Sequence, residues 1–186
     1  MSAVTPVTAE DFRRVLGHFC TGVTVVCAVD PDTREPVGFA CQSFAALSLE
    51  PPLVLFCPGR GSAAWAAIRR AGTFCVNVLA EHQRELSRAF GRSGDHKYAG
   101  VTWTPAANGA PVLPGVLTWI GGSVEAVHEA GDHVIVVGRV TELGPCRPGG
   151  PLLFYRSRYA AAELTAAEPP EVVDTLLSWG RHDDWM

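Results

Sequence analysis

Long apolar runs and runs of positive charge are both missing from this sequence of 186 residues. No apolar run approaches the roughly 18–20 residues of a membrane span. The first twenty residues carry charged side chains where a signal peptide would be apolar. The formal charge of -4 argues against a nucleic-acid surface. We therefore expect neither a membrane span nor a nucleic-acid partner.

Cysteine pairs at close spacing are missing as well. The six cysteines are scattered without any C-x-x-C spacing, and most of them lie inside apolar runs such as 25–29. This distribution favours buried thiols in a reduced, cytoplasmic protein over a disulfide framework. No group of histidine, cysteine and aspartate has metal-ligand spacing, so we expect no metal site.

Apolar residues make up 47% of the chain and charged residues 18%, which is typical of one globular domain with a sizeable core. Apolar and β-branched runs predict strands at 21–29, 37–40, 53–57, 73–79, 116–127, 133–143 and 151–155. Helices are predicted after residue 8 and at 62–71, 81–90 and 171–179, with a loop at 91–115. Because helices and strands do not alternate, the pattern predicts an α+β fold, mostly β, built as an antiparallel barrel or sandwich with helical insertions.

Two elements of this prediction rest on specific residues, the first helix and the long hairpin. Thr8 has the hydroxyl of a helix N-cap, and apolar residues then recur at spacings of three and four. They predict a helix with one apolar face, formed by Phe12, Val15, Leu16 and Phe19. The runs 116–127 and 133–143 flank a short turn with Gly131 and Asp132, which predicts a long hairpin.

The glycine turn after the strand at 53–57 is the first feature that suggests a ligand. Gly59, Gly61 and Ala64 fit the G-x-G-x-x-A pattern of dinucleotide-binding domains, and Glu81 follows where their ribose acceptor would lie. However, a hairpin precedes this unit, and no further βαβ repeats follow it. We therefore favour another architecture over a Rossmann dehydrogenase.

The glycine turn could bind a phosphate in either architecture. Gly59 and Gly61 allow the backbone to approach a ligand closely, and Ser62 is a helix cap. The unpaired N–H groups and the dipole of a helix N-terminus attract phosphate, and Arg60 could add a charge-assisted contact. A plain capped loop without a ligand is the alternative that the turn alone leaves open.

The segment 37–57 favours a ligand. It has small and hydroxyl residues where a strand would normally carry bulky ones. Small side chains leave room for a flat ring against the backbone, and Gln42, Ser43 and Ser48 offer hydrogen-bond partners.

Several motifs in a fixed order resemble the flavin reductases of two-component flavin-dependent monooxygenases. They occupy 17–26, 37–57, 74–79, 97–101, 131–133 and 151–156, most of the chain. Within that family, the reductase components of the steroid-degrading 3-HSA hydroxylases are most similar. Reductases that serve natural-product hydroxylases and halogenases are similar as well, so the resemblance leaves the pathway open.

The resemblance implies a homodimeric, antiparallel Greek-key split β-barrel over residues 8–162, followed by an extension at 163–186 with a short helix. It implies an NADH-dependent reductase of FMN or FAD, with NADPH left open as the donor. Hydride would pass from nicotinamide C4 to flavin N5, which requires no general base or nucleophile from the protein. The reduced flavin would diffuse to a separate monooxygenase or halogenase. A flavin-binding sensor or carrier without turnover is the alternative.

The resemblance also assigns residues to the two cofactors. The flavin side comprises Phe39, Ala40, Cys41, Gln42, Ser43, Ser48, Leu49, Cys57, Pro58, Gly59, Ser62, Trp65, Phe90, Gly91 and Lys97. The flavin phosphate would lie toward 57–62, and Lys97 is a candidate partner of the phosphate or ribityl chain. The nicotinamide side comprises His133, Phe154, Tyr155, Arg156 and Ser157, with His133 as an orienting residue. Without the resemblance, His133 would only pair with Asp132, and core packing of Phe154 stays an equal alternative.

Overall fold

The structure, a computed structural model, describes residues 6–94 and 96–162 of the chain. Its helices are α1 (Ala9–Leu16), α2 (Ala63–Ala71) and α3 (Arg84–Gly91). Its strands are β1 (Thr21–Gly22), β2 (Thr24–Val29), β3 (Pro36–Cys41), β4 (Ala45–Leu49), β5 (Pro52–Phe56), β6 (Thr73–Val78), β7 (Thr104–Pro105), β8 (Pro111–Val112), β9 (Thr118–Ala130), β10 (His133–Leu143), β11 (Leu152–Tyr155) and β12 (Arg158–Ala161). The helix predicted at 171–179 lies outside the described residues.

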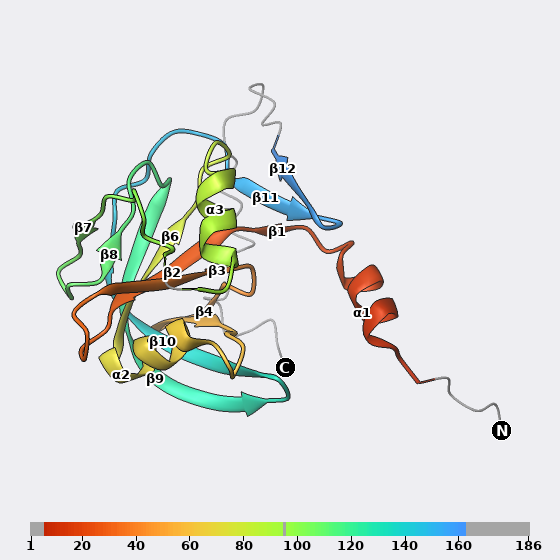
Figure 1. Ribbon diagram of the computed structural model, residues 1–186, viewed down its shortest axis with the longest axis horizontal. Coiled ribbons are helices and arrows are strands. Elements are labelled where there is room, and N and C mark those ends of the chain that lie inside the picture. Colours follow the sequence, from red (N-terminus) through yellow and green to blue (C-terminus); the bar gives the residue numbers. More distant parts are fainter. Residues whose placement is uncertain (1–5, 95, 163–186) are drawn as a thin grey trace.

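Antiparallel sheets form the body of the protein (Figure 1). One sheet has the strand order β3-β2-β6-β9-β10-β5-β4, and a smaller one has the order β1-β11-β12. Neighbouring strands in both sheets are antiparallel. The predicted mostly-β fold is therefore confirmed, and a doubly wound parallel sheet is excluded. None of the described helices is long and apolar enough to cross a bilayer.

The strand predicted at 21–29 is in fact two strands. β1 pairs with β11, whereas β2 pairs with β3 and β6, so the chain passes from one sheet to the other at Val23. The Val23 N–H donates to the Leu152 carbonyl, and the Val23 carbonyl accepts from Leu79. The apolar run hides this change of sheet because nearly all of its side chains are buried.

Other boundaries differ for local reasons. The long hairpin turns on Gly131 and Asp132 alone, and Gly131 has a φ of 65°, the left-handed conformation that such a turn requires. Helix α3 begins at Arg84 instead of 81, after a non-helical Gln83. The region predicted as a loop contains the short hairpin β7–β8, and β4 and β12 are additional strands.

Phe56, at the end of β5, lies at the centre of the main apolar core. The distance from its ring centroid is 5.2 Å to Phe74, 6.3 Å to Trp65 and 6.4 Å to Phe39. These three residues come from β6, α2 and β3. Fully burying one such side chain stabilises a fold by about 1.5–3 kcal/mol. The core therefore holds β3 and β5 near each other, although they lie far apart in the order of the sheet.

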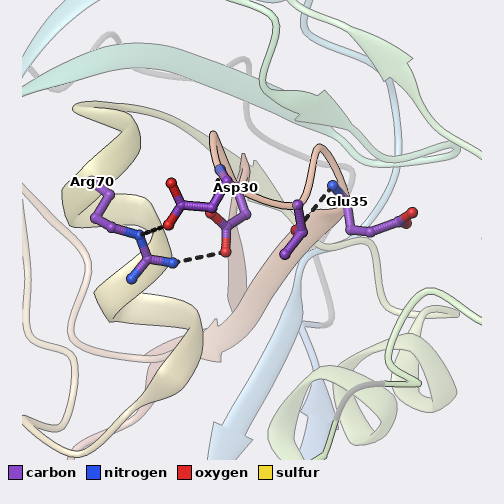
Figure 2. A network of polar contacts seen from close by, with 5 residues as sticks. Asp30, Glu35 and Arg70 are labelled. Atoms are coloured by element: carbon purple, nitrogen blue, oxygen red, sulfur yellow. Dashed lines mark hydrogen bonds and ion pairs between the residues drawn. The ribbon is translucent and has the colours of Figure 1, made fainter.

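A polar network fixes helix α2 to the turn between β2 and β3 (Figure 2). Arg70 of α2 donates to Asp30 at 2.8 Å and pairs with Asp32 at 2.9 Å. Asp30 is buried, and its other carboxylate oxygen accepts the backbone N–H of Asp32. A buried carboxylate is tolerated when it is paired and hydrogen-bonded in this way. The network anchors the carboxyl end of α2, opposite the glycine turn.

Helix α1 projects from the body of the protein (Figure 1). Its predicted cap is confirmed, because the Thr8 side chain accepts the N–H of Asp11. However, none of its residues is buried, and the predicted apolar face is 51–74% exposed at Phe12, Val15, Leu16 and Phe19. The base of the helix is attached through a hydrogen bond from the Arg156 N–H to the Gly17 carbonyl.

Candidate functional site

The glycine turn leads from β5 directly into α2. The Ser62 side chain accepts the N–H of Trp65 at 3.2 Å, so Ser62 is the predicted helix cap. The first N–H groups of α2, at Ala63 and Ala64, lie where an α-helix provides no acceptor. A Cβ placed on Gly61, two residues before the helix, would meet nothing within 4 Å, so there is open space beside the turn.

Backbone hydrogen bonds join this turn to the β9–β10 turn. The Arg60 N–H donates to the Asp132 carbonyl, and the Val134 N–H donates to the Pro58 carbonyl, both at 3.0 Å. The Arg60 side chain also binds the hairpin, through the Gly131 carbonyl at 3.2 Å and Glu129 at 3.2 Å. Arg60 therefore fixes the two turns together, and its guanidinium is already used by the protein.

His133 lies where the two turns meet. Its Nδ1 is 2.8 Å from the Asp132 carboxylate, and this hydrogen bond holds the pKa of Asp132 below its usual range. Its other ring nitrogen faces Gly59, 4.0 Å from the Cβ position there. The pairing with Asp132 therefore exists, and it orients the imidazole toward the glycine turn.

Two hollows lie side by side next to β3. The first, which we call the loop hollow, has a volume of about 340 Å³ and is lined by Phe39, Ala40, Cys41, Gln42, Ser43, Cys57, Pro58, Gly59 and His133. The second, the helix hollow, has about 360 Å³ and is lined by Val23, Ala40, Gln42, Ser87, Arg88, Gly91, Arg92, Phe154 and Tyr159. Because Ala40 and Gln42 line both, the two hollows form adjacent parts of one surface.

Most of the predicted flavin residues thus line the loop hollow, whereas Gly91 and Phe154 line the helix hollow. Of the residues that α3 and β12 contribute to the helix hollow, the sequence analysis predicted Gly91 and missed Ser87, Arg88 and Tyr159. Helical spacing could have pointed to Ser87, because it lies four residues before the predicted Gly91 and therefore on the same face of the helix. No sequence pattern pointed to Tyr159, because its strand β12 was not predicted. The Tyr159 hydroxyl lies 3.0 Å from the Ser87 hydroxyl.

Other predicted residues lie outside both hollows. Trp65 is 3% exposed and packs in the core, and Phe90 is fully buried against Tyr98. Ser48 and Leu49 are on the edge strand β4. Three further residues, Tyr155, Arg156 and Ser157, surround the β11–β12 turn. The positive φ values of 49° and 62° at Arg156 and Ser157 are uncommon for residues other than glycine and store strain in this turn.

Two predicted ligand residues have polar atoms that bind the protein itself. The Ser43 hydroxyl accepts the Cys57 N–H at 2.9 Å and joins the end of β3 to the end of β5. The Lys97 ammonium group donates to two backbone carbonyls, at Gly38 and Phe90.

Two buried thiols of β2 and β3 are poor nucleophiles. Burial raises the pKa of Cys41, which lines the loop hollow, and raises the pKa of Cys27 to about 12. Within the described residues, no group of histidine, cysteine and acidic side chains could hold a metal ion. The side chains that line the two hollows suit binding and orientation of ring ligands.

The protein thus combines antiparallel sheets, a capped glycine turn and two adjoining hollows. The sequence pattern of the flavin reductase like domain matches residues 16–163. The chain therefore belongs to the flavin reductase like family, as the motifs predict.

Particular relatives are close over nearly the whole chain. The reductase subunit HsaB of a flavin-dependent monooxygenase from Rhodococcus jostii is 49% identical over 99% of this chain and 95% of its own. A solved nitrilotriacetate monooxygenase component B homologue from Mycobacterium thermoresistibile is 48% identical, with a TM-score of 0.79 over 88% of this chain and 93% of its own. The NADH:FAD oxidoreductase SgcE6 of Streptomyces globisporus, solved with NAD and FAD fragments, is 30% identical, with a TM-score of 0.78 over 92% and 99% of the two chains.

Proposed function

We propose that the protein is an NADH:flavin oxidoreductase that reduces FMN or FAD by hydride transfer and supplies the reduced flavin to a separate monooxygenase or halogenase. The observation that carries this proposal is the pair of hollows joined at Ala40 and Gln42, in a chain that belongs to the flavin reductase like family. Hydride transfer requires two rings in contact, and adjoining hollows can hold them so. The protein contributes binding, orientation and exclusion of water.

We assign the flavin to the loop hollow, with its phosphate toward the N-terminus of α2. The small side chains of Ala40 and Ser43 leave room for the flavin ring. The dinucleotide is assigned to the helix hollow, where Phe154 and Tyr159 offer aromatic surfaces and Arg88 and Arg92 offer positive charge. His133 orients the nicotinamide from the loop side, and the strained turn at 156–157 borders the dinucleotide.

The deciding experiment follows the loss of NADH absorbance with and without added flavin. The proposal predicts that NADH oxidation depends on added FMN or FAD. A parallel series with NADPH shows which of the two nucleotides is the hydride donor. Flavin binding without NADH oxidation would identify a sensor or carrier. Turnover that needs a carbonyl or alcohol substrate and no flavin would identify a dehydrogenase.

The position of the phosphate is tested by Gly61→Glu. A carboxylate in front of α2 repels the phosphate of FMN, so we expect the KM for FMN to rise roughly tenfold while the KM for riboflavin, which has no phosphate, stays unchanged. Gly61→Gln has the same size without the charge and is the matched control. An equal rise for both flavins in the charged variant would place the phosphate elsewhere.

We further infer that the seven-stranded sheet is the Greek-key split β-barrel expected from the resemblance. Ser43 after β3 binds Cys57 after β5, although these strands lie toward opposite edges of the sheet. The Phe39 and Phe56 rings also meet in the core. Contacts between distant strands support a sheet that curls toward closure. We propose that residues 8–162 form this domain and that 163–186 are its extension. A cytoplasmic location stays a prediction.

A homodimer is proposed because the apolar face of α1 needs a partner. Helices of eight residues are unstable in water unless they pack against other groups. With two half-exposed phenylalanines, the face presents roughly 400–600 Å² of apolar surface, a large part of the ~800 Å² that each partner buries in a standard interface. The short tether at Gly17 directs α1 away from its own body, so a second copy is the proposed partner.

Substitution of Phe12 and Leu16 by aspartate should convert the dimer to a monomer in sedimentation velocity, because each charge would be buried in the interface. Glu10→Gln on the polar face is the control and should remain dimeric. A wild-type monomer, or a doubly substituted protein that stays dimeric, would contradict this role of α1.

A further inference from the structure

Lys97 is the only lysine of the chain, beside fourteen arginines. Its ammonium group donates to the Gly38 carbonyl at 3.1 Å and to the Phe90 carbonyl at 3.2 Å. Burial of this group lowers the pKa of Lys97 from its ordinary value. The side chain is thus partly withdrawn from solvent and fastened to two backbone segments that lie far apart in sequence.

Both acceptors are carbonyls that benefit from an external donor. Phe90 is next to the last residue of α3, where helix carbonyls have no intrahelical partner and the helix dipole attracts a cation. Gly38 lies in β3, an edge strand of the large sheet. A compact ammonium group can donate in several directions at once, whereas a planar guanidinium has a fixed fork. This difference explains a lysine at this position.

The two segments approach closely beside Lys97. A Cβ on Gly38 would lie 3.0 Å from the Phe90 ring, and one on Gly91 would lie 4.0 Å from the Ala40 Cβ. The adjacent residue Tyr98 strengthens the same contact: its hydroxyl donates to the Val37 carbonyl at 3.3 Å, and its ring packs on Phe90 at 4.9 Å. Residues 97 and 98 together hold α3 against β3.

Both elements line the helix hollow. Ala40 and Gln42 come from β3 and its end, whereas Ser87, Arg88 and Gly91 come from α3. We propose that Lys97 is a positioning residue: it fixes the carboxyl end of α3 against β3 and thereby sets the width of the helix hollow and the place of the rings at Ala40. This inference rests on the proposed flavin reductase function, and it replaces direct binding of the flavin phosphate by Lys97.

The test is Lys97→Met, which keeps an apolar stem and removes the donors. We expect kcat/KM to fall roughly 10- to 100-fold with FMN and by the same factor with riboflavin, because misplaced rings affect both flavins equally. A loss confined to FMN would show a direct phosphate contact and overturn the proposal. No loss with either flavin would overturn it as well.

A second measurement does not depend on activity. Hydrogen exchange of the amides at 87–92 should become faster in Lys97→Met, because α3 loses the donor at its carboxyl end. Unchanged exchange there would contradict the proposal, whereas a wild-type protein that fails to oxidise NADH with flavin would contradict only the proposed function. Arg139→Gln, which breaks the exposed pair with Glu125 far from α3 in sequence, is the control for exchange.

The single lysine allows a chemical test on the folded protein, should Lys97→Met fold poorly. Reductive methylation keeps the charge of Lys97 but leaves its nitrogen one N–H, so it can no longer serve both carbonyls. We expect a similar fall in kcat/KM for FMN and riboflavin. Lys97→Arg treated in the same way is the control for methylation at the N-terminal amine. Full activity after complete methylation of Lys97 would overturn the proposal.

Discussion

Gln42→Trp should reduce flavin reduction at least about a hundredfold while leaving the fold intact. Gln42 lines both hollows, and its side chain is exposed. An indole ring there would occupy the space in which the flavin and nicotinamide must meet, and hydride transfer cannot tolerate separated rings. Because the side chain is not buried, the melting temperature should change little.

The matched control is Glu35→Trp in the turn before β3. Glu35 is exposed, and its backbone N–H donates to the Thr33 hydroxyl within the turn (Figure 2). Glu35 directly precedes β3, whereas Gln42 directly follows it. Steady-state rates with FMN and NADH should be unchanged in the control. Normal turnover in Gln42→Trp would mean that the rings meet away from the shared wall of the two hollows.

The sequence reveals the half of the site that is built locally. Gly59, Gly61 and Ser62 lie within a few residues of each other, and turn geometry and helix capping act over that range. The cap at Ser62 and the residues 57–59 were therefore predictable. The same holds for the turn at Gly131, whose left-handed φ follows from its residue type.

The other half depends on contacts that no local pattern carries. The helix hollow needs α3, β3 and β12 together, and β12 pairs with β11 around a turn of Arg156 and Ser157. Neither residue type favours the positive φ of such a turn, so the hairpin was missed. Trp65 and Lys97 were assigned to the flavin through the family resemblance. In the structure the Trp65 side chain packs in the core, and the Lys97 ammonium group donates to two backbone carbonyls.

Gly138→Ala should destabilise the protein by about 2–4 kcal/mol, since the core at this point has no room for a methyl group. A Cβ on Gly138 would collide with the tip of the Phe74 ring and would also lie 2.8 Å from its Cε1 atom. Phe74 cannot move away, because it is fully buried and packs on Phe56. In thermal unfolding, the melting temperature should fall by roughly 5–15 °C for a chain of this length.

A double-mutant cycle identifies the Phe74 ring as the cause. Phe74→Leu alone removes part of the ring and should destabilise by about 1–3 kcal/mol. In the double variant with Gly138→Ala, the new methyl group occupies the vacated space, so the combined loss should be smaller than the sum by at least about 1 kcal/mol. Gly22→Ala, where a Cβ meets nothing within 4 Å, is the control and should stay close to wild type. Additive losses in the cycle would mean that Gly138 is required for the bulge at Glu125 of β9, which lies opposite it, and not for the space that the Phe74 ring fills.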